Sequence, residues 1–218
     1  MKKIIFYLLT LFVTIVNAQN DKFVVTMEKM ITELDSAGDF NALQNSANKF
    51  ERIANANSKE WLPLYYQSLS YVRILMKKED NSAKDEMYDR AELLINKGDS
   101  ISQDNSEVYV VKSLIMAMRV SVDPASRGQK HGRQASMLNS KAVELNMDNL
   151  RAYYLKGQGL MYTPEQFGGA AARAQPVLEE SIAKYKTFIP SSSIMPNWGE
   201  SQANEALTRC KNMLQNGK

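Results

Sequence analysis

Hydrophobic residues recur every three or four positions along most of this chain, which is typical of amphipathic helices. In the stretch Asp21 to Ser36, for example, Phe23, Met27 and Leu34 fall on one stripe, and Gly38 then interrupts the pattern. No strand pattern competes with the helical one, so we expect an all-α protein. The predicted helices are Asp21–Ser36, Phe40–Ala56, Ser58–Met76, Ala83–Lys97, Ser106–Arg119, Gly132–Leu145, Asn149–Met161, Ala170–Tyr185 and Asn197–Leu214.

One segment of the chain occurs twice. Asp104 to Ser113 returns 44 positions later as Asp148 to Gly157. Both copies begin with an Asp-Asn pair, which is suited to capping a helix, and in both an aromatic residue precedes a small residue by four positions. A weaker third copy places Ser68 at the small position. Because small side chains let neighbouring helices approach closely, the pattern predicts repeated helix pairs.

A second amphipathic segment precedes each of these helices. In two of these segments the small residues stand seven positions apart, and so share one helix face. Together the segments resemble the tetratricopeptide repeat family, whose unit is a helix-turn-helix with small residues at its eighth, twentieth and twenty-seventh positions. In that frame the eighth positions are Ser68, Ser113 and Gly157, the twentieth Ala91 and Ala135, and the twenty-seventh Gly98 and Ala142.

The repeats depart from the family pattern in length and in their final residue. Their spacing exceeds the usual period of about 34 residues, and Ser58, Gln103 and Met147 replace the usual closing proline. We expect the extra residues in the connections Lys77 to Ala83 and Val120 to His131. The resemblance covers about Asn41 to Ile189. It implies a single-domain, TPR-like α-solenoid, a right-handed stack of antiparallel helix pairs.

In such a stack the first helix of each pair lines a concave inner wall. This wall would be mostly apolar and aromatic, and would suit an extended peptide, a partner helix or a hydrophobic small molecule. The alternative is that the opening or the terminal helix fills the concavity, because exposed apolar patches are costly. The candidate contacts are Leu62, Tyr65, Leu69, Val110, Leu114, Arg151, Tyr154 and Gln158.

The N-terminus has the layout of a secretory signal peptide. Lys2 and Lys3 precede the apolar run Ile4 to Val16, and small residues then lead to a cleavage site after Ala18. The run is short for a bilayer span of about 20 residues, although a retained anchor is the alternative. We therefore expect a cleaved signal over residues 1–18, a helical repeat domain over 19–218, export to the periplasm or beyond, and no stable membrane insertion after cleavage.

Charge and cysteine content restrict the partners and the chemistry. Loss of Lys2 and Lys3 reduces the 27 basic residues to 25, against 24 acidic residues, so the exported chain is almost neutral. Both signs are interspersed along the chain, which argues against nucleic acid as a partner. Cys210 is the single cysteine and cannot form an internal disulfide. We expect it to be buried in the last helix, with a reactive thiol as the alternative.

Two connections carry possible site residues. Arg127, Lys130, His131 and Arg133 approach the start of a predicted helix, where free N–H groups could help to hold an anion. The alternative is a solvated elbow. A lone histidine does not make a metal site.

The second connection is Thr163 to Gly169. It is similar to the Pro-x-x-Phe-Gly-Gly turn of some exported repeat proteins, including the T component lipoproteins of tripartite transporters. We expect Phe167 to pack between helices, with ligand contact as the alternative, while the paired glycines provide backbone angles closed to other residues.

Sequence motifs of catalysis are missing. The chain has no Gly-x-Ser-x-Gly elbow, no phosphate-binding glycine loop and no cluster of metal-ligating residues. We therefore expect no catalytic residues, cofactor or metal. The predicted function is a non-catalytic exported scaffold for protein–protein interaction in the cell envelope. The alternative is a binding protein for an apolar small molecule that serves a transport system.

Overall fold

The computed structural model describes residues 21–77 and 84–216, and the predicted signal peptide lies outside this part. The described residues contain helices and no strand, which confirms the all-α prediction. A first helix over 21–36 is followed by α2 (Phe40–Ala56), α3 (Leu62–Lys77), α4 (Lys84–Ile101), α5 (Ser106–Val122), α6 (Pro124–Arg127), a π-helical segment (Gly128–Gly132), α7 (Arg133–Leu145), α8 (Leu150–Tyr162), a 3-10 turn (Glu165–Phe167), α9 (Ala171–Thr187) and α10 (Glu200–Gln215).

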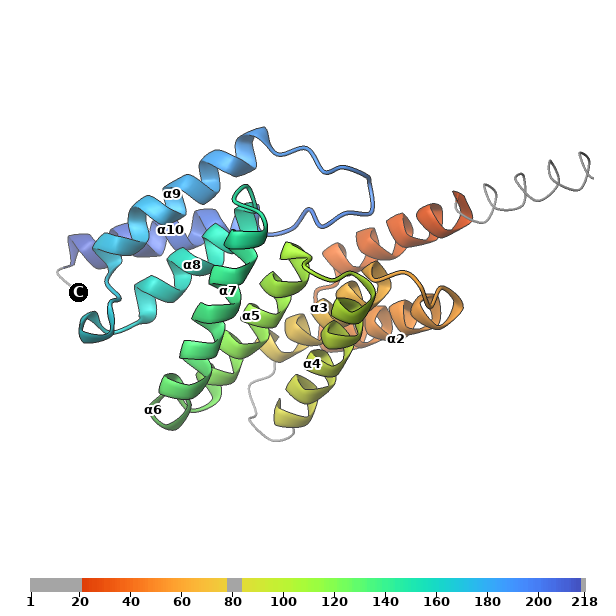
Figure 1. The fold of residues 1–218 in the computed structure, drawn as a ribbon, viewed down its shortest axis with the longest axis horizontal. Helices are drawn as coiled ribbons and strands as arrows, with labels where there is room; N and C mark the ends of the chain where they lie inside the picture. Colours follow the sequence, from red (N-terminus) through yellow and green to blue (C-terminus); the bar gives the residue numbers. More distant parts are fainter. Residues whose placement is uncertain (1–20, 78–83, 217–218) are drawn as a thin grey trace, which may run out of the picture.

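The helices form one stack of antiparallel pairs (Figure 1). Helix α3 packs against α4, α5 against α7, and α8 against α9, while α2 covers α3 at one end and α10 covers α9 at the other. The buried apolar side chains run through the whole stack as one continuous core. This is the single-domain helical solenoid that the repeats predict.

Close packing within each pair depends on the small residues. Ser68 Oγ donates to the carbonyl of Ala91 at 2.9 Å, and Ser113 Oγ donates to that of Ala135 at 2.9 Å. In the third pair a Cβ added to Gly157 would lie 2.6 Å from Leu178 Cγ. All three small residues are buried. Their predicted role as contact points between helices is therefore confirmed.

Asparagine, the second residue of each Asp-Asn pair, caps the helix. Asn105 Oδ1 accepts from the N–H of Glu107 at 3.0 Å, and Asn149 Oδ1 accepts from the N–H groups of Arg151 and Ala152. Each cap satisfies backbone donors of the first turn, which have no partner within the helix. The caps explain why α5 and α8 begin where the sequence predicts.

The chain between α5 and α7 differs from the prediction. Val120 to His131 was expected to be a connection, but α6, the π-helical segment and α7 are continuous helical structure from Pro124 onward. Pro124 stands at the first turn of α6, where its missing N–H costs nothing, and Asp123 caps that turn. The other predicted connection, Lys77 to Ala83, lies outside the described residues apart from Lys77, which ends α3.

The C-terminal cysteine is part of the core. Cys210 is fully buried, and its Sγ donates to the carbonyl of Ala171 at 3.2 Å. Burial raises the pKa of this thiol, so it is a packing residue, as expected, rather than a reactive one. Within residues 21–77 and 84–216, no helix has both the length and the apolar character that crossing a bilayer requires.

Candidate functional site

The predicted inner wall is closed in the structure. Seven of its eight candidate contacts are buried, and Gln158 is half-buried. The expectation of an open partner surface along this wall is therefore wrong, because the side chains are part of the core. The buried residues are Leu62, Tyr65, Leu69, Val110, Leu114, Arg151 and Tyr154.

A segment without regular structure, residues 188–199 between α9 and α10, lies across the N-terminal ends of α3 and α8. We call it the strap. Trp198 Nε1 donates to Tyr65 Oη at 2.8 Å, and Tyr66 Oη donates to the carbonyl of Ile194 at 3.0 Å. Tyr185 Oη donates to the carbonyl of Trp198 at 2.9 Å. The strap thus covers the wall at Tyr65, while the terminal helix α10 packs on α8, which carries Tyr154.

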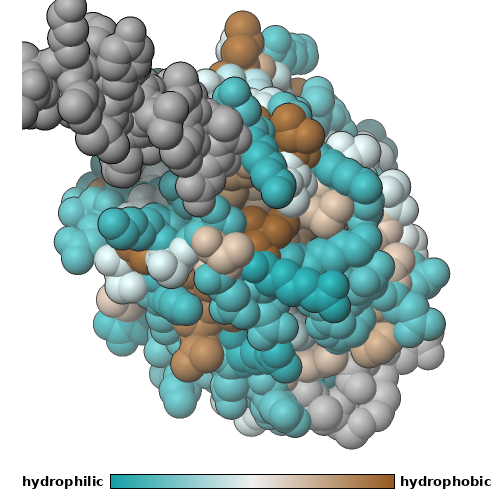
Figure 2. All heavy atoms as spheres, turned by 90° about the vertical axis from the view of Figure 1, so that its right-hand side faces the viewer, coloured by the Kyte–Doolittle hydropathy of each residue, from teal (hydrophilic) through white to brown (hydrophobic). Residues whose placement is uncertain are grey.

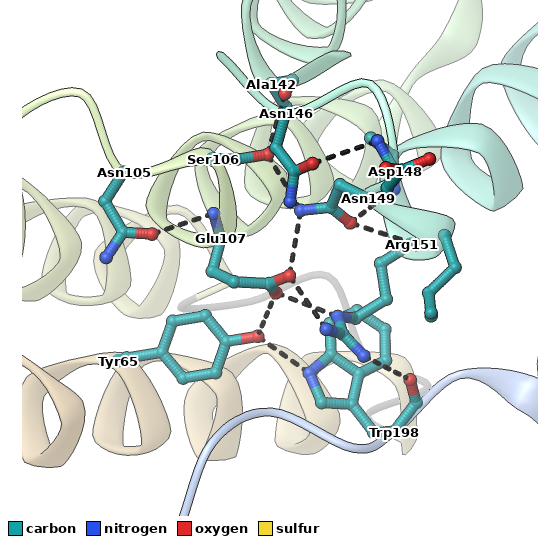
Figure 3. A network of polar contacts seen from close by, with 12 residues as sticks. Tyr65, Asn105, Ser106, Glu107, Ala142, Asn146, Asp148, Asn149, Arg151 and Trp198 are labelled. Atoms are coloured by element: carbon teal, nitrogen blue, oxygen red, sulfur yellow. Dashed lines mark hydrogen bonds and ion pairs between the residues drawn. The ribbon is translucent and has the colours of Figure 1, made fainter. Parts of the chain in front are cut away.

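A buried ion pair lies under the strap (Figure 3). Glu107 and Arg151 occupy equivalent positions in successive repeats, 44 residues apart. Arg151 Nε donates to one carboxylate oxygen of Glu107 and Nη2 to the other, both at 2.8 Å. The two side chains are only 3% and 11% exposed. This geometry is the bidentate arrangement that guanidinium and carboxylate groups favour.

Both members of the ion pair make further hydrogen bonds. Asn149 Nδ2 donates to Glu107 at 2.8 Å, Tyr65 Oη donates to it at 3.3 Å, and Arg151 Nη1 lies 3.4 Å from the carbonyl of Trp198. Burial opposes the charge of Arg151, but attraction to Glu107 and the hydrogen bonds between them outweigh it and raise the pKa of Arg151. Burial first, and then the charge of Glu107, raise the pKa of Tyr65. Because the two charges are paired with each other, this central polar network joins repeats to the strap and offers no free charge to a ligand.

The predicted anion site at the elbow is not formed. Arg127 donates to both carboxylate oxygens of Asp85 at 2.6 and 2.8 Å. The helix runs through Gly132 without a break, so α7 offers no free N-terminal N–H groups to an anion. Lys130 and Arg133 are exposed, and His131 Nδ1 lies 3.1 Å from Gln134 Oε1. The expectation failed because it assumed a helix start at this point.

For the turn between α8 and α9, the prediction is confirmed for the two glycines and wrong for Phe167. Gly168 has φ of +88°, in the left-handed region, and a Cβ on Gly169 would overlap the carbonyl of Thr163. Both positions therefore require glycine. Phe167, expected to pack between helices, is 72% exposed.

The described surface has an open groove between α4 and α7, with α5 as its floor. We call it the outer groove; its volume is about 410 Å³. Met116 on α5 is 7% exposed and lies at the bottom, whereas Met137 on α7 is 62% exposed. Its lining residues are Glu92, Asn96, Lys112, Met116, Gln134, Met137, Leu138 and Lys141.

Both lysines of the outer groove carry one acidic partner. Lys112 Nζ donates to Asp99 at 2.7 Å, and its side chain is 14% exposed. Lys141 Nζ donates to Glu144 at 3.1 Å, and this hydrogen bond raises the pKa of Lys141. Two ammonium groups therefore stand beside an apolar floor.

A second groove of about 430 Å³ lies between the strap and the ends of α5 and α7. We call it the strap groove. Phe188, Ile189 and Met195 supply apolar surface, and Ile189 is 86% exposed. Its base contains Glu107 and Arg151, whose charges neutralise each other.

Sequence reasoning missed both grooves. The repeat frame directs attention to the first helix of each pair, while the outer groove is formed largely by the second helices, α4 and α7. The available signal was a large apolar residue, Met137, among the polar positions of a predicted helix. The strap has no periodicity from which its path could be inferred. In the described ranges, no group of three or more His, Cys, Asp or Glu residues is placed to hold a metal ion.

On the face drawn in Figure 2, hydrophobic residues form small separate areas within a largely hydrophilic surface. The large exposed apolar side chains of the described residues are likewise dispersed over several helices and loops. Such isolated residues are ordinary for a folded protein. The grooves are therefore better candidates for binding than this face.

Comparison with known proteins adds family information. No protein-family model and no curated protein matches the chain. The solved structure of YrrB, a TPR protein with an unusual peptide-binding site, is a distant match, with a TM-score of 0.37, 15% identity, and coverage of 81% of this chain and 71% of that chain. The HusA haemophore from Porphyromonas gingivalis matches with a TM-score of 0.80 and 32% identity, over 87% of this chain and 93% of that chain. The chain therefore belongs to the same family as the HusA haemophore.

Proposed function

We propose that this protein is an exported, non-catalytic carrier that binds haem or a closely related tetrapyrrole. The observation that carries the proposal is the 32% identity to the HusA haemophore over 93% of that chain. Of the two functions that the sequence suggests, this favours the small-molecule carrier. Burial of the inner wall removes the surface expected for either function, so the choice between them rests on this similarity and on the grooves.

The outer groove has the chemistry that such a ligand requires. Haem is a flat apolar ring with two carboxylates at one edge, so a site needs apolar contact for the ring and cations for the edge. Met116, Met137 and Leu138 supply the apolar contact, and Lys112 and Lys141 supply the cations. Ligand sites commonly combine mainly apolar walls with a few placed polar groups.

The strap groove suits an anionic ligand less well. Its guanidinium, Arg151, is already bidentate with Glu107, and a ligand carboxylate would have to displace that partner. Breaking a buried ion pair is strongly unfavourable. We therefore place the ligand in the outer groove.

Groups able to coordinate haem iron lie at the outer groove. Methionine and histidine are both known axial ligands of haem. Met137 lines the groove, and His131 contacts Gln134, which also lines it. The described part of the groove thus offers the ligand an apolar contact, two cations and the thioether sulfur of Met137 as a donor for the metal.

The export of the protein rests on its N-terminal sequence. The basic start, the short apolar run and the site after Ala18 predict a cleaved signal. A carrier that acts outside the cytoplasm is the role these features support.

The test is a haemin titration of the mature chain, residues 19–218, followed by difference absorbance. We expect saturable binding to the parent chain and to two variants, Ile189→Asp in the strap groove and Val25→Asp on the first helix, which lines neither groove. Met137→Asp should weaken binding about tenfold or more, because a carboxylate would be desolvated against the ring. All three parent residues are 62–86% exposed, so the fold should tolerate each change.

The same titration separates the possible failures. A parent chain that does not bind haemin would contradict the proposed function. Loss of binding in Ile189→Asp with normal binding in Met137→Asp would move the site to the strap groove. Equal losses in all three variants would indicate unspecific adsorption.

A further inference from the structure

The charged side chains of the outer groove are distributed unevenly along its length. Lys112 reaches Asp99 in the last turns of α4, and Lys141 stands two turns beyond Gln134 along α7. Toward the other end, Glu92 accepts from Arg119 at 2.9 Å. One end of the groove therefore presents two ammonium groups, and the other an acid already paired with an arginine.

The two ammonium groups have donors to spare. A lysine ammonium carries three N–H donors. In the described structure Lys112 gives one to Asp99, and Lys141 gives one to Glu144. Lys112 is also held in place, since its Nζ lies 5.3 Å from the centre of the Tyr109 ring and its side chain is largely covered. A ligand carboxylate that binds Lys112 would therefore not have to order a flexible side chain.

We infer that Lys112 and Lys141 bind the two carboxylates of the tetrapyrrole, which orients the ring and makes the site selective for dicarboxylate macrocycles. This rests on the proposed function and adds the residues that determine orientation and selectivity. Met116, Met137 and Leu138 then contact the apolar ring. Lys112 and Lys141 are the positively charged side chains among the residues that line the groove. No other lining residue could select the carboxylate edge of the ring by positive charge.

The size of the effect follows from the acidic partners. Asp99 and Glu144 already balance much of the positive charge of the two lysines, so a ligand carboxylate gains only about as much from each lysine as a surface ion pair does. Loss of both interactions should therefore weaken binding about fivefold. A much larger effect would need unpaired, buried cations, which this groove does not contain.

The experiment compares two ligands on three proteins. The ligands are haemin and haemin dimethyl ester, in which both carboxylates are blocked. The proteins are the parent mature chain, the variant Lys112→Gln/Lys141→Gln, and the control Lys156→Gln/Lys186→Gln. The control makes the same change in net charge at two exposed lysines that do not line the groove. Glutamine keeps part of the aliphatic stem, and thermal melts confirm that each protein is folded.

We expect Lys112→Gln/Lys141→Gln to bind haemin about fivefold more weakly than the parent and to bind the diester as the parent does. The parent should prefer haemin over the diester by the same factor, and the control should behave as the parent with both ligands. A parent that binds neither ligand contradicts the proposed function itself. A parent that binds both ligands equally, or a groove variant or control that loses the same factor with both, overturns the role of the lysines and leaves haem binding intact.

Discussion

Gly157 on α8 provides a quantitative test of how the helix pairs hold together. A Cβ added at this position would lie 2.6 Å from Cγ, 2.7 Å from Cδ2 and 3.3 Å from the backbone nitrogen of Leu178 on α9. Leu178 is completely buried and cannot swing into solvent. The change Gly157→Ala therefore forces α8 and α9 apart or distorts Leu178.

The same helix contains a matched control. Gly159 is two residues further along α8, is exposed, and a Cβ added to it would meet no atom within 4 Å apart from the neighbouring backbone of its own helix. In a helix interior, alanine is better than glycine by about 1 kcal/mol. Overpacking of a tight core costs about 1–3 kcal/mol. Because an added Cβ has free space at Gly159, Gly159→Ala should show only this gain and stabilise the protein by up to about 1 kcal/mol. Because both variants gain the same propensity, the difference between them isolates the steric cost at Gly157, about 1–3 kcal/mol.

Urea unfolding followed by far-UV circular dichroism measures this difference. For a domain of this size, 1 kcal/mol corresponds to a shift of about 2–4 °C in the melting temperature, so thermal melts provide a second readout. If Gly157→Ala proves as stable as Gly159→Ala, the close approach of α8 and α9 does not constrain the fold.

Two further predictions concern the central polar network. Arg151→Met should destabilise the protein by about 3–5 kcal/mol, because Glu107 would stay buried without its cation; Glu107→Met/Arg151→Met should cost less than Arg151→Met alone in urea unfolding, and additive losses would refute this coupling. Burial raises the pKa of Tyr65 well above its ordinary 10.0, so the folded protein holds this proton more tightly than the unfolded chain does. The resulting stability is complete below pH 10.0 and is lost as the pH rises further; urea midpoints at several alkaline pH values should fall, and should fall less in Tyr65→Phe, whereas an equal fall in both would contradict the assignment.

Much of the fold could be predicted because its signals are local. Asn105 and Asn149 cap helices through side chains close in sequence to the groups they satisfy. The small residues mark contact points between helices: Ser113 donates to the carbonyl of Ala135, and a larger residue at Gly157 would collide with Leu178. The stretch from Pro124 to Gly132 escaped prediction because its two glycines oppose a helix locally, whereas the bidentate contact of Arg127 with Asp85 on α4 holds it from a distance.

The site could not be predicted in the same way. Arg151 was a candidate contact on an open wall, and only the fold shows that it is paired with Glu107. The covering strap is held by single long-range hydrogen bonds, such as Trp198 to Tyr65 across 133 residues, which leave no periodic trace in the sequence. The outer groove combines residues from three helices, and its shape depends on how those helices cross.

The most direct test of ligand binding in the outer groove uses the methionine methyl groups as probes. Met116 and Met137 line the outer groove, Met195 lines the strap groove, and Met147 is exposed but lines neither. In methyl NMR spectra of the mature chain, saturation with diamagnetic zinc protoporphyrin should shift the Met116 and Met137 signals through the ring current and leave Met195 and Met147 unchanged. A shift of Met195 with unchanged Met137, or no shift of any methyl group at saturating ligand, would contradict a tetrapyrrole site between α4 and α7.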